Sequence, residues 1–337
     1  PSNIAIVKYW GKTGLQIPMN PSFSFSLNSS CTKTKILWEP KSKGEECSFS
    51  FSYQGVPKPA FEPKIRNLLK ELQPELPWLK EWNLFIDSSN SFPHSAGIAS
   101  SASAMSALAL CIVSMEKNMN NTFRSSVDFF RRASFFSRLG SGSACRSVYP
   151  YASLWGLTAG MPDSSDQFAV PMESQLHPMF KTLQDYVLLV NRSEKPVSSS
   201  AGHSLMNNHP YRQARIKQAN DNIEKILTFV NTGDWDGFTE VAEEEALSLH
   251  GLMMSSKPGY LLLEPESIRI IHSLQALRKR RSLPVCFTID AGPNIHILFP
   301  ESSKAEVEAW ISSEFPEYNN SQSILRDQIG SGPFEII

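Results

Sequence analysis

The feature that most constrains the fold of this chain is the segment 99–119, which consists largely of Ala, Ser, Leu and Met. Apolar side chains occupy nearly its whole circumference, and this pattern predicts a long helix buried on most faces. Other elements must therefore pack around it. Short runs typical of strands precede it in the sequence, at 4–9, 23–27, 34–38 and 82–88.

The rest of the chain continues this mixture of strands and helices without a fixed repeat period. Further helices are expected at 63–72, 123–139, 211–230, 235–253, 265–281 and 304–315, and further strands at 187–191, 284–290 and 294–299. Pro, Ser, Asp and Gln accumulate at 162–178, which is typical of a crossing between lobes. A chain of 337 residues is long enough for two domains. The sequence thus predicts an α+β protein with two lobes, residues 1–172 and 180–337.

Composition narrows the class of protein. Hydrophobic residues make up 41% and the formal net charge is -1, which argues against a disordered chain and against a nucleic-acid-binding protein. No apolar run approaches the length that spans a bilayer, so no membrane segment is expected. Five cysteines are scattered without a CxxC pair, which favours neither a disulfide framework nor a zinc site. A reducing, cytoplasmic location fits this cysteine usage best.

The first candidate motif is NIAIVKYWGKTG, residues 3–14, which contains the letters GKT. A phosphate-binding P-loop needs a glycine five residues before that GK, and Ile6 stands there instead. The P-loop interpretation therefore fails. On this stretch alone, the pattern favours Lys8 and Lys12 as the solvated end of an edge strand.

Two further stretches could bind anions. SFPHSAGIASSASA, residues 91–104, is a turn rich in small residues that leads into the long helix, so its free N–H groups favour either a phosphate or a simple serine cap. GSGSACRS, residues 140–147, is not GxGxxG, yet it offers bare backbone and the Arg146 guanidinium, which suits a carboxylate or phosphate. A glycine helix end followed by an ordinary turn explains the same letters.

The C-terminal half contributes an aspartate and a second hydroxyl-rich turn. In FTIDAGPN, residues 287–294, Asp290 ends an apolar strand, where a carboxylate either caps the AGP turn or faces a site. VSSSAGHS, residues 197–204, enters a helix and is compatible with a helix cap. No pair of histidines has metal-ligand spacing, so no metal held tightly by protein side chains is expected.

The order of these motifs resembles that of the mevalonate diphosphate decarboxylases, a family of the GHMP kinase superfamily. The resemblance rests on NIAxxKYWGK, FPxxAGxASSAS, GSGSACRS, the VSSxxGxxL turn and DAGPN, and it extends to the terminal SGPFEII, which resembles the family's last strand. It implies an N-terminal lobe like domain 2 of ribosomal protein S5 and a C-terminal ferredoxin-like lobe. The active site is then expected in the cleft between the lobes.

The resemblance also implies a reaction. Such enzymes use ATP and Mg²⁺ to phosphorylate the tertiary 3-hydroxyl of mevalonate 5-diphosphate, then release phosphate and CO₂ to give isopentenyl diphosphate. It further implies a homodimer. Asp290 then orients or deprotonates the hydroxyl, Lys8 stabilises the transferring phosphoryl group, and Arg146 holds the carboxylate.

The remaining site residues are carried over from the same resemblance. Those expected to bind the substrate are Asn3, Tyr9, Trp10, Gly11, Lys12, Lys64, Ser141, Gly142, Ser143, Ala144, Cys145, Arg146 and Ser200. Those expected to bind ATP are Ser88, Pro93, Ser95, Ala96, Gly97, Ile98, Ala99, Ser100 and Ser101.

The chain also departs from the family pattern. His203 stands where a methionine is expected, and Pro150 and Tyr151 replace a Gly-Gly-acidic run. The family varies between a hydroxyl residue and arginine at Ser200, and the match around Lys64 is weak. A kinase or decarboxylase acting on mevalonate or mevalonate 5-phosphate therefore remains an alternative, and a non-catalytic binding protein is a more remote one.

Overall fold

The computed structural model describes residues 1–41, 46–92, 98–120, 123–192 and 197–335. These residues form three four-stranded sheets and a two-stranded hairpin, with helices packed between and around them. No helix in these ranges is both long enough and apolar enough to cross a membrane. All five cysteines are free thiols.

The first sheet carries the N-terminal motif. Its strands are antiparallel, in the order β1 (Asn3–Val7), β4 (Ser22–Ser26), β9 (Ala152–Trp155) and β10 (Ala169–Pro171). In the sequence, the hairpin of β2 (Lys12–Thr13) and β3 (Ile17–Pro18) stands between β1 and β4 and forms a separate two-stranded sheet. The alternation SFSFS in β4 places Phe23 and Phe25 on one face, in the apolar core, and serines on the other.

The second sheet and three helices form the body of the N-terminal lobe. The sheet has the order β5 (Thr32–Pro40), β8 (Trp82–Asn90), β6 (Ser48–Tyr53) and β7 (Val56–Pro57), with β6 and β8 parallel. Against it pack α1 (Glu62–Leu72), α2 (Ser100–Asn120) and α3 (Ser126–Gly140), and α3 leads into the 3-10 segment Gly142–Val148. No residue of α2 from 100 to 116 is exposed, which confirms the predicted buried helix.

The third sheet belongs to the C-terminal lobe. Its antiparallel strands have the order β12 (Cys286–Thr288), β13 (Ile295–Pro300), β11 (Leu183–Leu188) and β14 (Ile324–Gln328). The helices of this half are α4 (Pro178–Lys181), α5 (Ser199–Leu205), α6 (Arg212–Thr232), α7 (Trp235–Ser255), α8 (Pro265–Arg281) and α9 (Lys304–Glu314).

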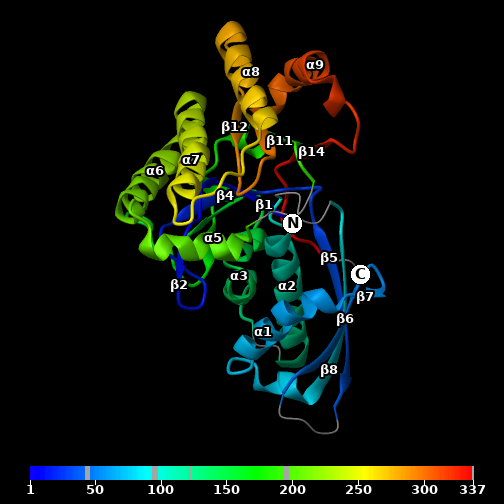
Figure 1. The fold of residues 1–337 in the computed structure, drawn as a ribbon. Helices are drawn as coiled ribbons and strands as arrows, with labels where there is room; N and C mark the ends of the chain where they lie inside the picture. Colours follow the sequence, from blue (N-terminus) through cyan, green and yellow to red (C-terminus); the bar gives the residue numbers. More distant parts are fainter. Residues whose placement is uncertain (42–45, 93–97, 121–122, 193–196, 336–337) are drawn as a thin grey trace.

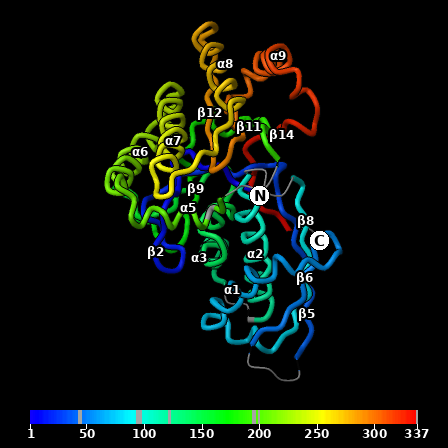
Figure 2. The backbone as a smooth tube through the Cα atoms, viewed as in Figure 1, coloured from blue at the N-terminus to red at the C-terminus, as the bar shows by residue number. Residues whose placement is uncertain are grey.

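The two halves are joined through a shared core. In Figure 1, α6 to α9 lie toward one end of the molecule and α1, α2 and β5, β6 and β8 toward the other. The N-terminus lies in the middle, as the backbone trace in Figure 2 also shows. Strand β1 contacts both α6 and α7, and one cluster of buried side chains runs from β1 and β4 into α6, α7 and β11. This packing fixes the end of β1 against the C-terminal lobe.

The structure differs from the secondary-structure prediction at several points. The expected crossing at 162–178 contains β10, because residues 169–171 pair with β9 in the first sheet. The terminal SGPFEII forms no strand over 331–335, and the last strand is β14, which the sequence reading missed. Gly332 in this segment has φ +91°, which is not a strand conformation. Just before it, the backbone of Gly330 packs so closely that an added Cβ would lie 2.6 Å from the Leu27 carbonyl oxygen. Strands β6 and β9 were also missed. The lobe limits 1–172 and 180–337 stay a prediction.

Candidate active site

A buried ion pair joins the first and last motifs of the sequence. Lys8 follows the last residue of β1, and its Nζ lies 2.9 Å from Oδ1 of Asp290, which follows β12. The Lys8 side chain is 2% exposed and that of Asp290 is 25% exposed. The carboxylate therefore contacts the ammonium group while part of its side chain stays accessible to solvent.

Arg146 is the second buried cation of the site. It is 2% exposed, and its guanidinium donates to Ser22 Oγ and, at 3.3 Å, to Asn3 Oδ1. The described part of the chain gives Nε no partner and brings no carboxylate within ion-pair distance of it. Burial lowers the pKa of Arg146, while the charge of Asp290 acts in the opposite direction. A buried cation without an acid beside it suits an anionic ligand.

Asn3 and Tyr9 complete this part of the site. Asn3 Nδ2 donates to the Ser143 carbonyl at 3.2 Å and to Ser147 Oγ at 2.7 Å, so its amide ties β1 to the segment that carries Arg146. The Tyr9 hydroxyl is buried and has no hydrogen-bond partner among the residues described. Burial raises the pKa of Tyr9, which keeps the phenol protonated. It is therefore a buried donor whose hydrogen bond the described residues leave unsatisfied.

The segment after α3 supplies backbone to the site. A Cβ on Gly142 would lie 2.7 Å from Tyr9 Oη, so only glycine allows this approach. Ala144 and Cys145 are fully buried, and Cys145 Sγ donates to the Gly142 carbonyl at 3.0 Å. Burial raises the pKa of Cys145 to about 12, so this thiol is structural. Ser141 is half-buried beside them.

The turn after β1 is held by a neutral histidine. The Gly11 N–H donates to His203 Nδ1 at 2.9 Å, and the imidazole ring packs against Tyr9 and Trp10 with ring centroids 4.4 and 4.7 Å apart. Burial, with the charges of Lys12 and Arg146, lowers the pKa of His203 to about 3. His203 therefore positions the turn without adding charge. Ser200, predicted from the same motif, is exposed at the start of α5.

Lys12 and Lys64 form a pair of neighbouring cations. Burial lowers the pKa of Lys12, and the positive charge of Lys64 lowers it further. Lys12 Nζ donates to the Gln16 amide oxygen at 2.9 Å, and neither lysine forms an ion pair with a described carboxylate. Two cations close enough to repel each other attract a polyanion.

The residues predicted to bind ATP lie partly around one cavity. A space of about 110 Å³ opens between β5, β8, α1 and α2. It is lined by Ser88, Ser100 and Ser101 from that prediction, by Lys64, which was predicted to bind the substrate, and by Asn90, among others. Ile98 is buried and its carbonyl accepts from Ser2 Oγ at 2.7 Å, while Ala99 has φ +38°. Pro93, Ser95, Ala96 and Gly97 lie outside the described residues.

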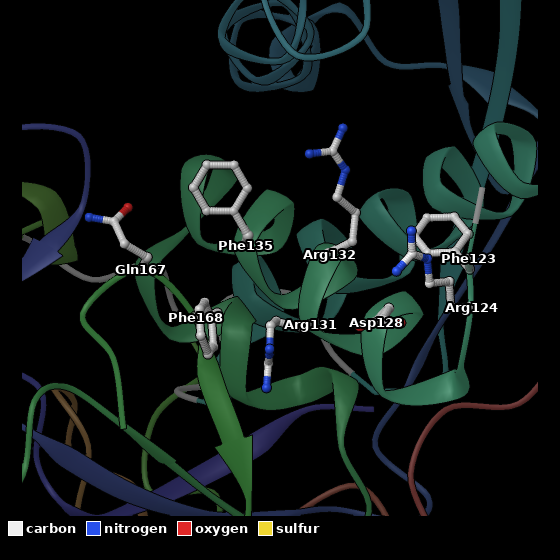
Figure 3. A pocket seen from close by; sticks show the side chains of 8 residues that line it. All are labelled: Phe123, Arg124, Asp128, Arg131, Arg132, Phe135, Gln167 and Phe168. Atoms are coloured by element: carbon white, nitrogen blue, oxygen red, sulfur yellow. The ribbon is translucent and has the colours of Figure 1, made fainter. Parts of the chain in front are cut away.

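A larger hollow lies elsewhere, on the surface of α3 (Figure 3). It has a volume of about 570 Å³ and is lined by Phe123, Arg124, Asp128, Arg131, Arg132, Phe135, Gln167 and Phe168. None of the predicted site residues lines it. Arg132 there pairs with Glu75 and Glu116, and Arg131 lies over the Phe168 ring. This hollow is separate from the candidate site around Lys8.

Both halves of the chain match models of one family. Residues 1–168 match the diphosphomevalonate decarboxylase-like N-terminal domain, and residues 186–332 match the mevalonate 5-diphosphate decarboxylase C-terminal domain. The chain belongs to the mevalonate diphosphate decarboxylase family. A diphosphomevalonate decarboxylase from Ganoderma lucidum is 29% identical to this chain, over 95% of this chain and 82% of the relative.

Solved structures of the family share the fold. The crystal structure of mevalonate diphosphate decarboxylase from Staphylococcus aureus has a TM-score of 0.84 and 29% identity, covering 100% of this chain and 96% of that one. A structure of MDDEF in complex with MVAPP, AMPPCP and magnesium has a TM-score of 0.81 and 26% identity, covering 98% and 95%. These matches confirm the predicted two-domain GHMP-kinase fold.

Sequence reasoning missed the residues that hold Lys8 in place. The Lys8 N–H donates to Glu245 at 2.8 Å, and the Lys8 carbonyl accepts from Asn20 at 3.0 Å and from Arg215 at 2.8 Å. Glu245 and Arg215 lie within long helices whose local pattern gives no sign of these contacts. Only the packing of α6 and α7 against β1 reveals them.

Proposed function

We propose that this protein catalyses the ATP-dependent decarboxylation of (R)-mevalonate 5-diphosphate to isopentenyl diphosphate, through 3-phosphorylation, in the mevalonate pathway of isoprenoid biosynthesis. The observation that carries the proposal is the Lys8–Asp290 ion pair within electrostatic range of Arg146, a buried cation that lacks a described acid partner. Family membership supports the same reaction.

Asp290 accepts the proton of the 3-hydroxyl as that oxygen attacks the γ-phosphoryl group. Its partly open carboxylate can meet a hydroxyl while Lys8 stays at 2.9 Å on its other side. The Lys8 ammonium then stabilises negative charge on the transferred phosphoryl group and on the departing phosphate.

Arg146 holds the substrate carboxylate until it leaves as CO₂. Departure of the 3-phosphate creates electron demand at the tertiary carbon, and the electrons of the carbon–carboxylate bond then form the new double bond. The guanidinium must bind the carboxylate without stabilising its ground state more than the transition state. Because its partners Ser22 and Asn3 are neutral, the positive charge of the guanidinium stays available for the carboxylate.

ATP with Mg²⁺ supplies the phosphoryl group. The cavity between the second sheet and α2 is proposed as part of the nucleotide site, because Ser88, Asn90, Ser100 and Ser101 add neutral polar groups to its largely apolar lining. The ranges that the structure describes hold no cluster of three or more His, Cys, Asp or Glu side chains able to bind a metal. The ion is therefore proposed to arrive on the ATP phosphates, and the solved complex of MDDEF contains magnesium with AMPPCP.

Lys12, Tyr9 and the backbone of 141–143 are proposed to bind the 5-diphosphate. Lys12 and Lys64 give this end two cations without described counter-ions. The neutral His203 and the exposed Ser200 add none. A substrate with fewer 5-phosphates is the alternative that this modest charge keeps open.

One assay separates these alternatives. Purified protein is incubated with ATP, Mg²⁺ and mevalonate carrying zero, one or two 5-phosphates, and ADP and CO₂ are measured together. We expect equal amounts of both with the diphosphate. ADP without CO₂ contradicts the decarboxylase assignment, and neither product with any substrate identifies a non-catalytic binding protein.

We also propose a cytoplasmic homodimer. The five free cysteines support a reducing compartment, and the dimer is carried over from the family resemblance. Light scattering coupled to gel filtration tests the dimer, with about twice the chain mass of 37.7 kDa expected.

A further inference from the structure

Glu245 on α7 is a fully buried carboxylate whose two oxygens are both engaged. Oε1 accepts from Arg215 Nη1 at 2.7 Å and from Asn222 Nδ2 at 2.8 Å. Oε2 accepts from Arg215 Nη2 at 2.6 Å and from the Lys8 N–H at 2.8 Å. The carboxylate thus links a buried arginine of α6 to the backbone of a predicted catalytic residue.

The same arginine reaches the other side of Lys8. Arg215 Nη2 donates to the Lys8 carbonyl at 2.8 Å. Ladder pairing of β1 with β4 ends at Val7, so the Lys8 peptide groups depend on side chains for their hydrogen bonds. Glu245 and Arg215 hold the peptide units on both sides of the Lys8 Cα.

Helix α7 also contacts the backbone of Asp290. The His250 Nε2–H donates to the Asp290 carbonyl at 3.1 Å. Helix α7 therefore contacts the backbone of both members of the Lys8–Asp290 ion pair, which lie in the two parts of the chain that match separate family domains.

Stability alone explains the Arg215–Glu245 pair poorly. Both side chains lose their hydration, and buried ion pairs can often be replaced by apolar residues without loss of stability. An apolar pair in their place could not bind the Lys8 N–H and carbonyl.

We propose that Glu245 and Arg215 are positioning residues that hold Lys8 against Asp290 for phosphoryl transfer. The expected fall in kcat rests on the proposed function. The expected loss of the Lys8–Asp290 contact rests on the geometry alone. Displacement of a reacting group by about 1 Å commonly lowers the rate by about 100-fold.

The kinetic test uses Glu245→Gln, which keeps the size of the side chain but places an amide donor against Lys8 N–H or Arg215. We expect kcat for ADP formation to fall about 10- to 100-fold, with KM for ATP and for mevalonate 5-diphosphate changed less than about threefold. Glu116→Gln is the matched control, because Glu116 is a buried glutamate bound through both oxygens to Arg132, away from the site. Its kcat should match that of the unaltered protein.

A double-mutant cycle separates positioning from a structural role. In a Lys8→Met background, single-turnover ADP formation should fall less than about twofold on adding Glu245→Gln, because the residue acts through Lys8. The same fold loss in both backgrounds overturns the proposal. If Glu245→Gln does not fold, Arg215→Lys takes its place, since it keeps the charge but loses the two-pronged contact.

A readout independent of activity is a crystal structure of the ligand-free variant. We expect the Lys8 Nζ–Asp290 Oδ1 contact of 2.9 Å to be lost in Glu245→Gln and kept in Glu116→Gln. A retained contact overturns the positioning role. Absence of ADP from the unaltered protein with every mevalonate instead refutes the proposed function and leaves this structural outcome decisive.

Discussion

Two buried arginines from opposite halves of the molecule differ in whether a described carboxylate pairs with them. Arg215 is 3% exposed and Arg146 is 2% exposed, so both have lost their hydration. Arg215 meets the Glu245 carboxylate through two nitrogens, at 2.7 and 2.6 Å. Arg146 meets only neutral oxygens among the described residues.

The difference lies in the counter-ion rather than in burial. The charge of an arginine paired with a carboxylate is already neutralised. Such an arginine can still donate hydrogen bonds to the backbone, as Arg215 does to the Lys8 carbonyl. An arginine buried among neutral groups carries an uncompensated cost that an anionic ligand can offset. We therefore propose Arg146 as the group that binds the ligand and Arg215 as a support for the Lys8 backbone.

The largest expected effect is that of Asp290→Asn on turnover. The amide cannot accept the hydroxyl proton, so kcat should fall by about 10³-fold, while ATP binding changes little. Steady-state kinetics and nucleotide titration measure this. Undiminished turnover would show that another carboxylate is the base. Arg146 would then have no established place beside the reacting groups, and its contrast with Arg215 would lose its basis.

Stability measurements on the two arginines test the comparison itself. Arg215→Met leaves Glu245 buried without its ion pair, and we expect the free energy of unfolding to fall by about 3–5 kcal/mol. Arg146→Met strands no carboxylate and should leave that free energy unchanged or raise it. Urea unfolding of both variants decides the matter, and equal losses would show that Arg146 is a structural residue.

A smaller effect is expected at the other cations of the site. Lys12→Gln removes one of two neighbouring positive charges, so KM for mevalonate 5-diphosphate should rise about tenfold, as for the loss of one charged hydrogen bond. Lys217→Gln is the control, since Lys217 is exposed and pairs with Asp221 at 2.6 Å. A similar rise in both variants would indicate general electrostatic attraction instead of a site.

The smallest expected effect concerns His203 and pH. The pKa of His203 falls from 6.5 to about 3 on folding. Between about pH 6.5 and about pH 3, the unfolded chain therefore binds a proton on this ring and the folded chain does not. The stabilising contribution of the neutral ring is therefore present above about pH 6.5 and is lost as pH falls. His203→Gln keeps an acceptor for Gly11 N–H without this titration.

Urea unfolding at several pH values measures that difference. Between about pH 6 and about pH 4, the unaltered protein should lose about 1 kcal/mol per pH unit more than His203→Gln. Parallel pH profiles of the two proteins would contradict the neutral state assigned to His203.

Much of the fold could be predicted from local patterns. The helix α8 was expected at 265–281 and is found at Pro265–Arg281, because Pro265 opens it and the apolar spacing continues to its end. Strand β6 was missed even though SFSFSY has the same alternation as β4, and Phe51 of this strand is buried in the core of the N-terminal lobe. Strand β14, with the sequence ILRDQ, was missed because only its place at the edge of the third sheet makes it a strand.

The residues of the candidate site that lie in sequence motifs were predictable. Those that helix packing brings to the site were not. The order of the motifs singled out Lys8, Arg146 and Asp290, and the structure brings Lys8 and Asp290 into contact. The roles assigned to them stay predictions. Glu245 and Arg215 were out of reach because their partner, Lys8, lies more than 200 positions away in the sequence.

The most direct test of the account asks whether Arg146 binds the substrate carboxylate. In an Asp290→Asn background, which leaves the substrate intact, titration calorimetry compares Arg146 with Arg146→Met. Loss of a buried charge pair costs about 2–5 kcal/mol, so Kd for mevalonate 5-diphosphate should rise by about 30-fold or more. Kd for isopentenyl diphosphate, which has no carboxylate, should change little. Equal weakening of both ligands, or no change in either, would contradict the account.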